Sequence, residues 1–244
     1  MDKDEKIILS SLEDKKMRSF QKNIPLYSSF LDLHLQSLAL TKYKDLSLFG
    51  GYPDAERKIA VFLPDYMTEP DKDALKIVRV SVRGKEILTH RDYLGAALGV
   101  GIKREQLGDI LVEKSYADLI IKGDMADFLA NNLVKAGRAN VSCEILPIDV
   151  LQNIKNEPKS IKSVSVSSLR LDKIVAEGFK ISRTDASSFI LSGKVFVNQR
   201  EVLKPDLKLE ENDKITLRGK GKLQILSLNG LSKKGKIRVD LGVY

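Results

Sequence analysis

Apolar and polar positions alternate along the first third of the chain at helical and strand spacings. Residues 2–20 place isolated apolar side chains among many charged ones, which predicts an amphipathic helix. Leucine-rich apolar positions across 28–41 predict a second helix, and short apolar runs at 46–49 and 58–63 predict two strands. We therefore expect residues 1–72 to form a small α+β subdomain of two helices and two strands.

The next block, residues 73–150, repeats this alternation in a regular order. Strand patterns and helix patterns follow one another as β-α-β-β-α-β, at 74–83, 89–98, 109–113, 117–121, 123–135 and 141–146. That order predicts the ferredoxin-like arrangement that RRM domains also use. The third strand, however, lacks the aromatic residues on which RRM domains stack bases. The pattern therefore predicts an RRM-like fold without supporting RNA binding on its sheet.

A polar stretch, which we interpret as a linker over residues 151–163, separates this block from a helix-helix-hairpin pattern in residues 164–244. The first helix has apolar residues at three- and four-residue spacing from Leu171 to Phe179. The second begins with Ser182 followed by Asp185, the spacing of a capping box. Gly193 suits the left-handed stop after that helix, and two strand-like runs follow it.

Cationic residues remain in this third block after the apolar faces are assigned: Arg170, Lys173, Arg183, Lys194, Arg200 and Arg218. Arg183 falls in the first turn of its helix, where the helix dipole disfavours a cation. A phosphate group could approach both that side chain and the unpaired N–H groups of the turn. For any one of these residues, a solvated helix face is an equally good interpretation.

Four spaced blocks of this region resemble the S4 RNA-binding domain: Arg170–Lys173, Ser182–Thr184, Gly193–Asn198 and Asp213–Gly219. The resemblance implies an αα-hairpin packed on a small sheet, whose two helices and adjoining loop grip structured RNA. The matching RNA-contact positions are Arg170, Lys173, Arg183, Thr184 and Lys194. Gln199 stands where the family usually has glycine, which affects only the expected turn geometry.

Charge is distributed unevenly along the chain. Residues 159–244 carry 18 Lys and Arg against 9 Asp and Glu, whereas residues 1–158 carry 23 against 24, so the net +8 comes from the last third. A basic domain beside a neutral one is expected of a protein that binds a polyanion. Cys143 is the sole cysteine, and the two histidines have no metal-ligand spacing. We expect no cofactor, no metal, no membrane segment and a cytoplasmic location.

Residues of the first two blocks carry a narrower resemblance, to the bacterial YlmH group. The matching segments are Phe49–Tyr52 with Ala55–Arg57, and His90–Gly95 with Arg104 and Gly108–Ile110. Members of that group combine an RRM-like region with a C-terminal S4 domain. The resemblance implies a binder of rRNA or the ribosome, in particular of large subunits that carry stalled peptidyl-tRNA, with tRNA as a second candidate partner.

One segment invites a catalytic interpretation. Asp92 in His90-Arg91-Asp92 resembles the catalytic aspartate of pseudouridine synthases, but the neighbouring residues supply no polar partners. Thr89 with Asp92 instead predicts a capped helix start, which we take as the interpretation of this segment. We therefore expect a monomeric, non-enzymatic α+β protein that binds RNA. An rRNA-modifying enzyme with the S4 domain as substrate clamp, and a protein adaptor with a basic tail, are the alternatives.

Overall fold

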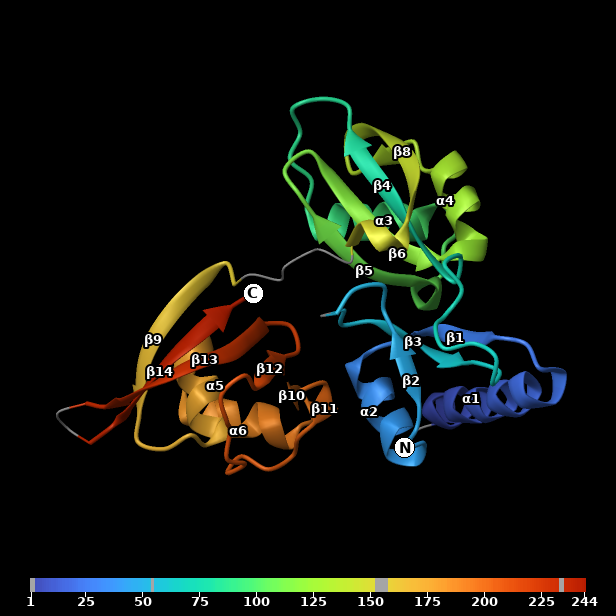
Figure 1. The fold of residues 1–244 in the computed structure, drawn as a ribbon. Coiled ribbons are helices and arrows are strands. Elements are labelled where there is room, and N and C mark those ends of the chain that lie inside the picture. Colours follow the sequence, from blue (N-terminus) through green and yellow to red (C-terminus); the bar gives the residue numbers. More distant parts are fainter. Residues whose placement is uncertain (1–2, 54, 152–157, 233–234) are drawn as a thin grey trace. The chain divides into compact units, whose positions relative to one another are not determined.

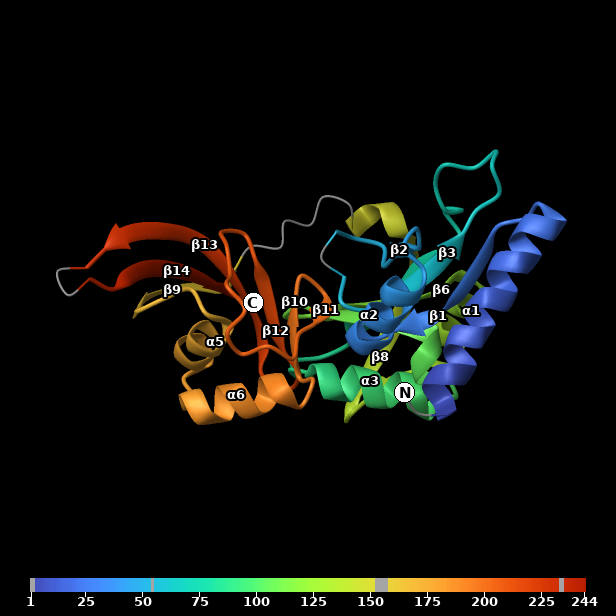
Figure 2. The ribbon, with the colours of Figure 1, turned by 90° about the horizontal axis from the view of Figure 1, so that it is seen from below.

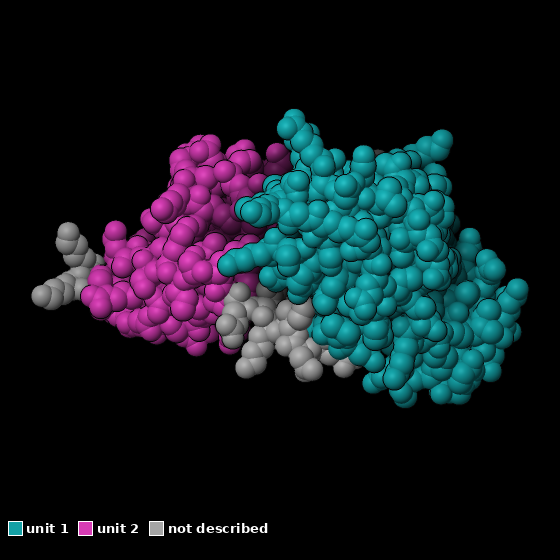
Figure 3. Space-filling model, turned by 90° about the horizontal axis from the view of Figure 1, so that it is seen from above, with its two compact units in different colours: residues 1–154 teal, residues 155–244 magenta. Residues whose placement is uncertain are grey.

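The computed structural model describes residues 3–53, 55–151, 158–232 and 235–244. The chain divides into two compact units, Met1–Ile154 and Lys155–Tyr244, coloured separately in Figure 3. Each unit has its own apolar core. The helices and strands of both confirm the α+β class.

The first part of unit 1 is a three-stranded antiparallel sheet covered by two helices. Its elements are α1 (Lys3–Lys22), β1 (Leu26–Leu31), α2 (Leu33–Lys42), β2 (Ser47–Phe49) and β3 (Lys58–Phe62), and the strand order is β1-β3-β2. A core that includes Leu12, Leu31 and Ala39 joins α1 and α2 to the sheet.

The predicted helix over 28–41 is wrong at its start, because residues 28–31 belong to β1 rather than to α2. Ser28 is buried and its Oγ accepts the main-chain N–H of Ala60 in β3 at 2.7 Å, which ties this segment into the sheet. Asp32 then starts the helix, since its Oδ1 accepts the N–H of Leu35 at 2.9 Å. The subdomain consequently has three strands where two were expected.

The second part of unit 1 is a five-stranded antiparallel sheet in the order β5-β6-β4-β8-β7. Its elements are β4 (Leu75–Val82), α3 (His90–Gly99), β5 (Leu107–Val112), β6 (Tyr116–Lys122), α4 (Ala126–Asn132), β7 (Lys135–Ala136) and β8 (Ala139–Pro147), with short 3₁₀ turns η1 (Arg104–Gln106), η2 (Gly123–Met125) and η3 (Ile148–Leu151). Without the short β7, this is the ferredoxin-like strand order that the sequence predicted. The helix predicted over 123–135 is shorter, because Lys135 and Ala136 form a hairpin with β8.

Both faces of this sheet are occupied, but by different partners. Helices α3 and α4 cover one face, where Val78 and Val80 of β4 lie in their core (Figure 1). On the opposite face, Leu75 and Ile77 pack against Phe30 and Ile59 of the first sheet. The two-residue period of β4 thus places apolar side chains on both sides, as expected for a strand buried on both faces.

On the rest of that second face, the polar side chains of Arg79 and Asp118 pair with each other. Arg79 donates from Nε and Nη2 to the two carboxylate oxygens of Asp118 at 2.7 and 2.8 Å. The guanidinium lies over the ring of Tyr116, 4.3 Å from its centroid. An RRM uses this face to stack RNA bases. Here the first sheet and this network occupy it, which gives a physical reason for the missing aromatic signature.

Unit 2 packs two helices against a six-stranded antiparallel sheet in the order β11-β10-β12-β13-β14-β9. Its elements are β9 (Ser160–Val166), α5 (Leu171–Phe179), α6 (Arg183–Leu191), β10 (Val195–Val197), β11 (Arg200–Glu201), β12 (Lys214–Leu217), β13 (Gly221–Leu231) and β14 (Ile237–Val243). Figure 2 shows α5 and α6 on the same side of this sheet. Gly178 allows the close packing, because a Cβ there would lie 2.2 Å from the Leu223 side chain.

The sheet of unit 2 is larger than the sequence predicted, and it corrects the linker. Residues 160–163, assigned to a linker over 151–163, form the start of β9 and pair with β14. Positions 152–157 of that linker lie outside the described residues. In β9, Val164 and Val166 point toward the core, and serines flank them. Two apolar residues among serines are too few for the sequence to distinguish a strand from a polar linker. No helix in the described part of the chain is long and apolar enough to span a membrane.

Candidate nucleic-acid interface

The site is built around the start of α5. Arg170 is the N-cap residue of this helix, and its N-terminal turns bury Leu171, Ile174 and Val175 against the sheet. Asp172 lies in the first turn, where the helix dipole favours a carboxylate. Its side chain is only 2 % exposed, so its charge requires partners within the fold.

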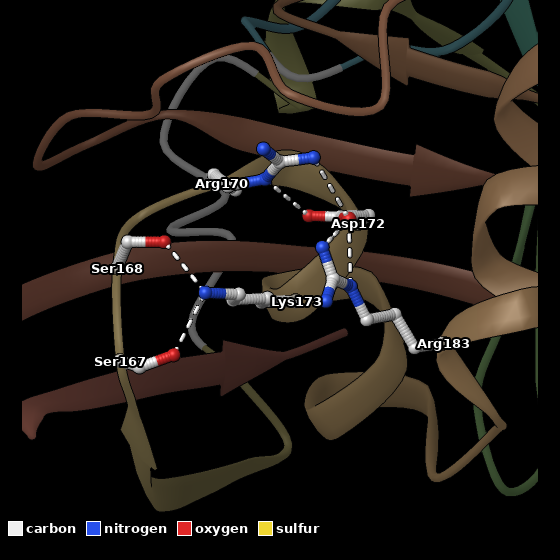
Figure 4. A network of polar contacts seen from close by, with 6 residues as sticks. All are labelled: Ser167, Ser168, Arg170, Asp172, Lys173 and Arg183. Atoms are coloured by element: carbon white, nitrogen blue, oxygen red, sulfur yellow. Dashed lines mark hydrogen bonds and ion pairs between the residues drawn. The ribbon is translucent and has the colours of Figure 1, made fainter.

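Two arginines supply those partners (Figure 4). Arg170 donates from Nε and Nη2 to the two oxygens of Asp172 at 3.1 and 3.2 Å. Arg183, in the first turn of α6, donates from Nε to Oδ2 at 2.8 Å. The disfavoured position of Arg183 indicated a partner outside its own helix. The structure provides one within the protein, the buried Asp172 carboxylate of α5, and a phosphate contact stays a prediction.

Electrostatics keeps Asp172 ionised. Its burial acts to raise the pKa of the carboxyl, but the hydrogen bonds from Arg170 and Arg183 outweigh burial, so the pKa lies below its usual value. The same contact raises the pKa of Arg170. One buried negative charge therefore serves two guanidinium groups, which are 38 % and 57 % exposed. The cluster keeps a surplus positive charge in a fixed position at the surface.

Lys173 lies beside this cluster and is also held in place. Its Nζ donates to Ser167 Oγ at 2.7 Å and to Ser168 Oγ at 2.9 Å, as Figure 4 shows. Neutral hydroxyl groups orient the ammonium group without cancelling its charge. Arg170, Lys173 and Arg183 therefore form one surface, which we call the α5 cation cluster.

A second cationic position lies at the other end of α6. Lys194 is exposed between α6 and β10, with its Nζ 5.4 Å from the centroid of the Phe189 ring. The main-chain N–H of Arg218 donates to the carbonyl of Lys194 at 2.9 Å, which brings these two residues together. The nine residues of α6, at about 1.5 Å each, separate its two ends by roughly 12 Å, and Lys194 lies past the far end from Arg183. One phosphate group cannot contact both ends.

The two remaining predicted RNA-contact residues are Thr184 and Arg200. Thr184 is exposed beside Arg183 in the first turn of α6. Arg200 is exposed in β11, paired with Val197 at the far end of β10 from Lys194. The turn before it places Asn198 and Gln199 at positive φ, +50° and +67°, as a two-residue hairpin turn requires. Gln199 therefore keeps the turn in spite of replacing glycine.

Sequence reasoning missed two residues. Asp172 stands within the Arg-Leu-Asp-Lys block, and its spacing to Val175 and Phe179 places it at the edge of the buried stripe, which was the available signal. Lys180 ends α5 in the left-handed conformation, φ +54° and ψ +51°, where glycine is usual. No sequence signal marks that strain, since Gly178 is nearby and is the more obvious helix end.

The candidate catalytic residue has a structural role. Asp92 accepts hydrogen bonds from the main-chain N–H of Thr89 at 2.8 Å and from its hydroxyl at 2.7 Å. These bonds complete a capping box at the start of α3, as the second interpretation predicted, and they lower the pKa of Asp92.

Two family models match the chain. The S4 domain model matches residues 169–215, which contain the α5 cation cluster and Lys194. The model described as the putative RNA-binding domain in YlmH matches residues 71–150. Together with the fixed surface cations, these matches define an RNA-binding protein whose C-terminal unit contains an S4 domain.

Whole-chain comparisons define the family more narrowly. The chain is 36% identical to "Ribosome-associated protein quality control protein P2" of Bacillus subtilis (strain 168), over 97% of this chain and 94% of that protein. The chain therefore belongs to the YlmH family. The solved structure of the cell division protein ylmH from Streptococcus pneumoniae is similar in fold, with a TM-score of 0.53 at 20% identity. The similarity covers 63% of this chain and 97% of the Streptococcus pneumoniae chain.

Proposed function

We propose that this protein is a non-enzymatic factor that docks through its S4 domain on structured rRNA of the large ribosomal subunit. The subunits it recognises carry stalled peptidyl-tRNA, which places the protein in ribosome-associated quality control or translation. Unit 1 contacts a second element of the complex, with tRNA as the first candidate.

One observation carries this proposal: the α5 cation cluster presents a surplus of positive charge whose geometry is fixed before any ligand binds. Arg170 and Arg183 share one buried carboxylate, so binding need not immobilise either side chain. Fixed guanidinium groups suit phosphate oxygens. The sequence net charge of +8 favours the same partner.

The comparisons support the ribosomal part of the proposal. The Bacillus subtilis relative carries ribosome-associated quality control in its name, and it matches this chain nearly end to end. The resemblance to S4-containing factors that bind large subunits with stalled peptidyl-tRNA supports the finer assignment. Capping of α3 by Asp92 supports a non-enzymatic role, because this carboxylate already has two donors from Thr89.

The mechanism is phosphate neutralisation at two positions. The α5 cation cluster contacts one stretch of RNA backbone, and Lys194 with Arg218, past the far end of α6, contacts another. Thr184 adds a hydrogen bond to a sugar or phosphate oxygen. If about 4–6 phosphates are neutralised, the log–log dependence of affinity on salt has a slope of about −3 to −5.

Co-sedimentation with purified large ribosomal subunits tests the proposal. The decisive variant is Lys173→Gln/Lys194→Gln. Among the described residues, the two ammonium groups lie by serine hydroxyls and an aromatic ring and form no ion pair, so their loss leaves no buried charge unpaired. We expect at least 10-fold weaker binding and a salt slope flatter by about 2. The matched control, Lys114→Gln/Arg138→Gln, removes the same charge from exposed positions of unit 1.

Equal binding by both double variants would contradict docking through the S4 domain. Absence of the wild-type protein from the subunit fraction at low salt would overturn the ribosomal assignment itself. For the non-enzymatic part, Asp92→Asn should leave cellular rRNA modification unchanged. A lost modification would restore the enzyme interpretation.

A further inference from the structure

A groove in unit 1 contains two arginines that the S4 interface does not use. It has a volume of about 450 Å³, within the range of small-molecule sites. Its lining residues come from α1, β1, the start of α2, η1 and the segment just before β3. The charged groups that line it are Asp32, Arg57, Arg104 and Glu105.

Main-chain carbonyls hold both guanidinium groups. Arg57 donates from Nε to Leu107 O at 3.0 Å and from Nη2 to the carbonyls of Phe30 and Arg104, each at 3.3 Å. Arg104 donates from Nη1 to Leu107 O at 2.7 Å and to Gly108 O at 3.3 Å. These contacts fix the two groups but, unlike a carboxylate, do not neutralise them.

Neighbouring carboxylates are already engaged elsewhere. Asp109 accepts the Tyr52 hydroxyl at 2.8 Å and the main-chain N–H groups of Glu56 and Arg57 at 2.7 and 3.0 Å. Asp32 caps α2. Within the described residues, neither Arg57 nor Arg104 has a carboxylate oxygen within 4.0 Å. Half-buried cations without an ion pair are unusual in proteins.

The electrostatic consequence extends to the neighbours. Burial, followed by the charge of Arg104, lowers the pKa of Arg57 to about 10. Burial also lowers the pKa of Arg104. His90 has a pKa below its usual value because of burial and then the charge of Arg104. Asp32 and Glu105 balance the two arginines in the groove as a whole, but the guanidinium groups themselves are partly desolvated, which strengthens their interaction with an anion that contacts them directly.

Arg104 also has the geometry to bind an anion. Its Nε and Nη2 edge donates to no acceptor in the described part of the chain, because Nη1 alone contacts the carbonyls. The same edge binds a carboxylate bidentately in Arg79 and in Arg170. Two parallel N–H groups fit the oxygens of a phosphate equally well.

We propose that this groove binds the phosphate group of a nucleotide, either free or at the 5′ end of an RNA, through Arg104 and Arg57. The sugar and base lie along the apolar wall formed by Ile8, Leu12 and Leu35. Glu105 at the rim opposes the anion, and it limits affinity. This site is separate from the S4 interface and does not depend on the function proposed for it.

Calorimetric titration of the full chain with adenosine 5′-monophosphate, at constant ionic strength, tests the site. We expect binding that adenosine does not reproduce, a 10- to 100-fold loss in Arg104→Gln, and a few-fold gain in Glu105→Gln. Arg104→Lys keeps the charge but removes the bidentate edge, so it should weaken binding less than Arg104→Gln. Lys114→Gln, at an exposed position of unit 1 that does not line the groove, should leave the titration unchanged.

Short oligoribonucleotides with a 5′-phosphate or a 5′-hydroxyl distinguish the two sources. Preference for the phosphorylated form indicates an RNA end, and binding of the mononucleotide alone indicates a free nucleotide. If adenosine 5′-monophosphate binds no better than adenosine, or if Arg104→Lys and Arg104→Gln both bind as wild type, the proposal is wrong. Thermal unfolding of each variant identifies any that fail to fold. If Arg104→Gln does not fold, the titration of Arg104→Lys tests the proposal in its place.

Discussion

Two aspartates in this protein are each held by an arginine fork, one in each unit, and they differ in how their charge is balanced. Asp118 has one partner, Arg79, which also stacks on Tyr116. Asp172 has two partners, Arg170 and Arg183. The charges of the first network cancel, whereas the second network keeps one surplus positive charge.

Under the proposed function, this difference explains why the S4 domain rather than the RRM-like sheet would contact RNA, in a chain with two RNA-associated domain types. The RRM-like domain keeps the fold of its class but covers the sheet face with another sheet and a neutral network. The S4 domain presents an unbalanced charge in a fixed geometry. Fold class therefore does not determine the interface, and the ratio of arginine to carboxylate distinguishes the two surfaces.

The sharpest test of this comparison is Asp172→Asn against Asp118→Asn. Removing the carboxylate raises the net charge in both variants, so simple electrostatics predicts tighter RNA binding for each. We expect about 10-fold weaker binding of Asp172→Asn to large subunits instead, because Arg170 and Arg183 lose their common anchor and must be ordered on binding. Asp118→Asn should bind as wild type.

Glu177→Gln is the matched control, since Glu177 is an exposed carboxylate on α5. It adds the same charge without affecting the anchor, so slightly tighter binding is expected. Co-sedimentation at several salt concentrations compares the three variants. Asp172→Asn binding as tightly as Glu177→Gln would refute fixed geometry and leave net charge as the explanation.

Stability at acid pH sharpens the same comparison. Because the folded pKa of Asp172 lies below its unfolded value of about 3.9, the carboxylate stabilises the fold fully above that value. This contribution is lost as pH falls through the lowered folded pKa. We expect Asp172→Asn to be about 1–2 kcal/mol less stable than wild type at pH 7, and the gap to close below about pH 4.

Urea unfolding followed by circular dichroism at pH 7, 5, 4 and 3 measures this gap. Glu177→Gln, which leaves the contacts of Asp172 intact, is measured beside it as the control variant. A gap that persists unchanged at pH 3 would mean that packing, rather than the ionised carboxylate, accounts for the loss.

The sequence was sufficient for the elements whose signals are local. The helix cap at Ser182, the stop at Gly193 and the hairpin turn at Asn198 form where they were predicted, because each depends on contacts within a few residues. The strand at residues 28–31 was misassigned as helix, since its identity depends on pairing with β3, about 30 residues away. β9 was missed for the same reason, as its partner is β14.

The candidate site divides in the same way. All seven predicted RNA-contact residues were chosen for charge or motif position, but the positions of Arg170 and Arg183 depend on Asp172, which contributes no positive charge and was given no role. Contacts between the start of α5 and the start of α6 bring Arg170 and Arg183 together. Nothing in the sequence shows that the two arginines share one carboxylate.

The salt dependence of subunit binding should differ between variants of the two networks, which is a smaller effect. Arg183→Gln removes one cation from the α5 cluster, so the log–log salt slope of subunit binding should become flatter by about 1. Arg79→Gln removes a cation whose charge Asp118 balances, and it should leave the slope unchanged. Equal flattening by both would place the RRM-like sheet within the RNA interface and break the comparison.

The smallest expected effect concerns strain at Lys180. This exposed residue holds the left-handed end of α5 at a conformational cost that glycine avoids. Lys180→Gly should stabilise unit 2 by about 0.5–1 kcal/mol, a rise that thermal unfolding detects. If Lys180 contacts RNA, the same variant binds large subunits a few-fold more weakly while it folds more stably. Lys180→Asn, which also tolerates this conformation, should behave alike, and unchanged binding by both would exclude Lys180 from the interface.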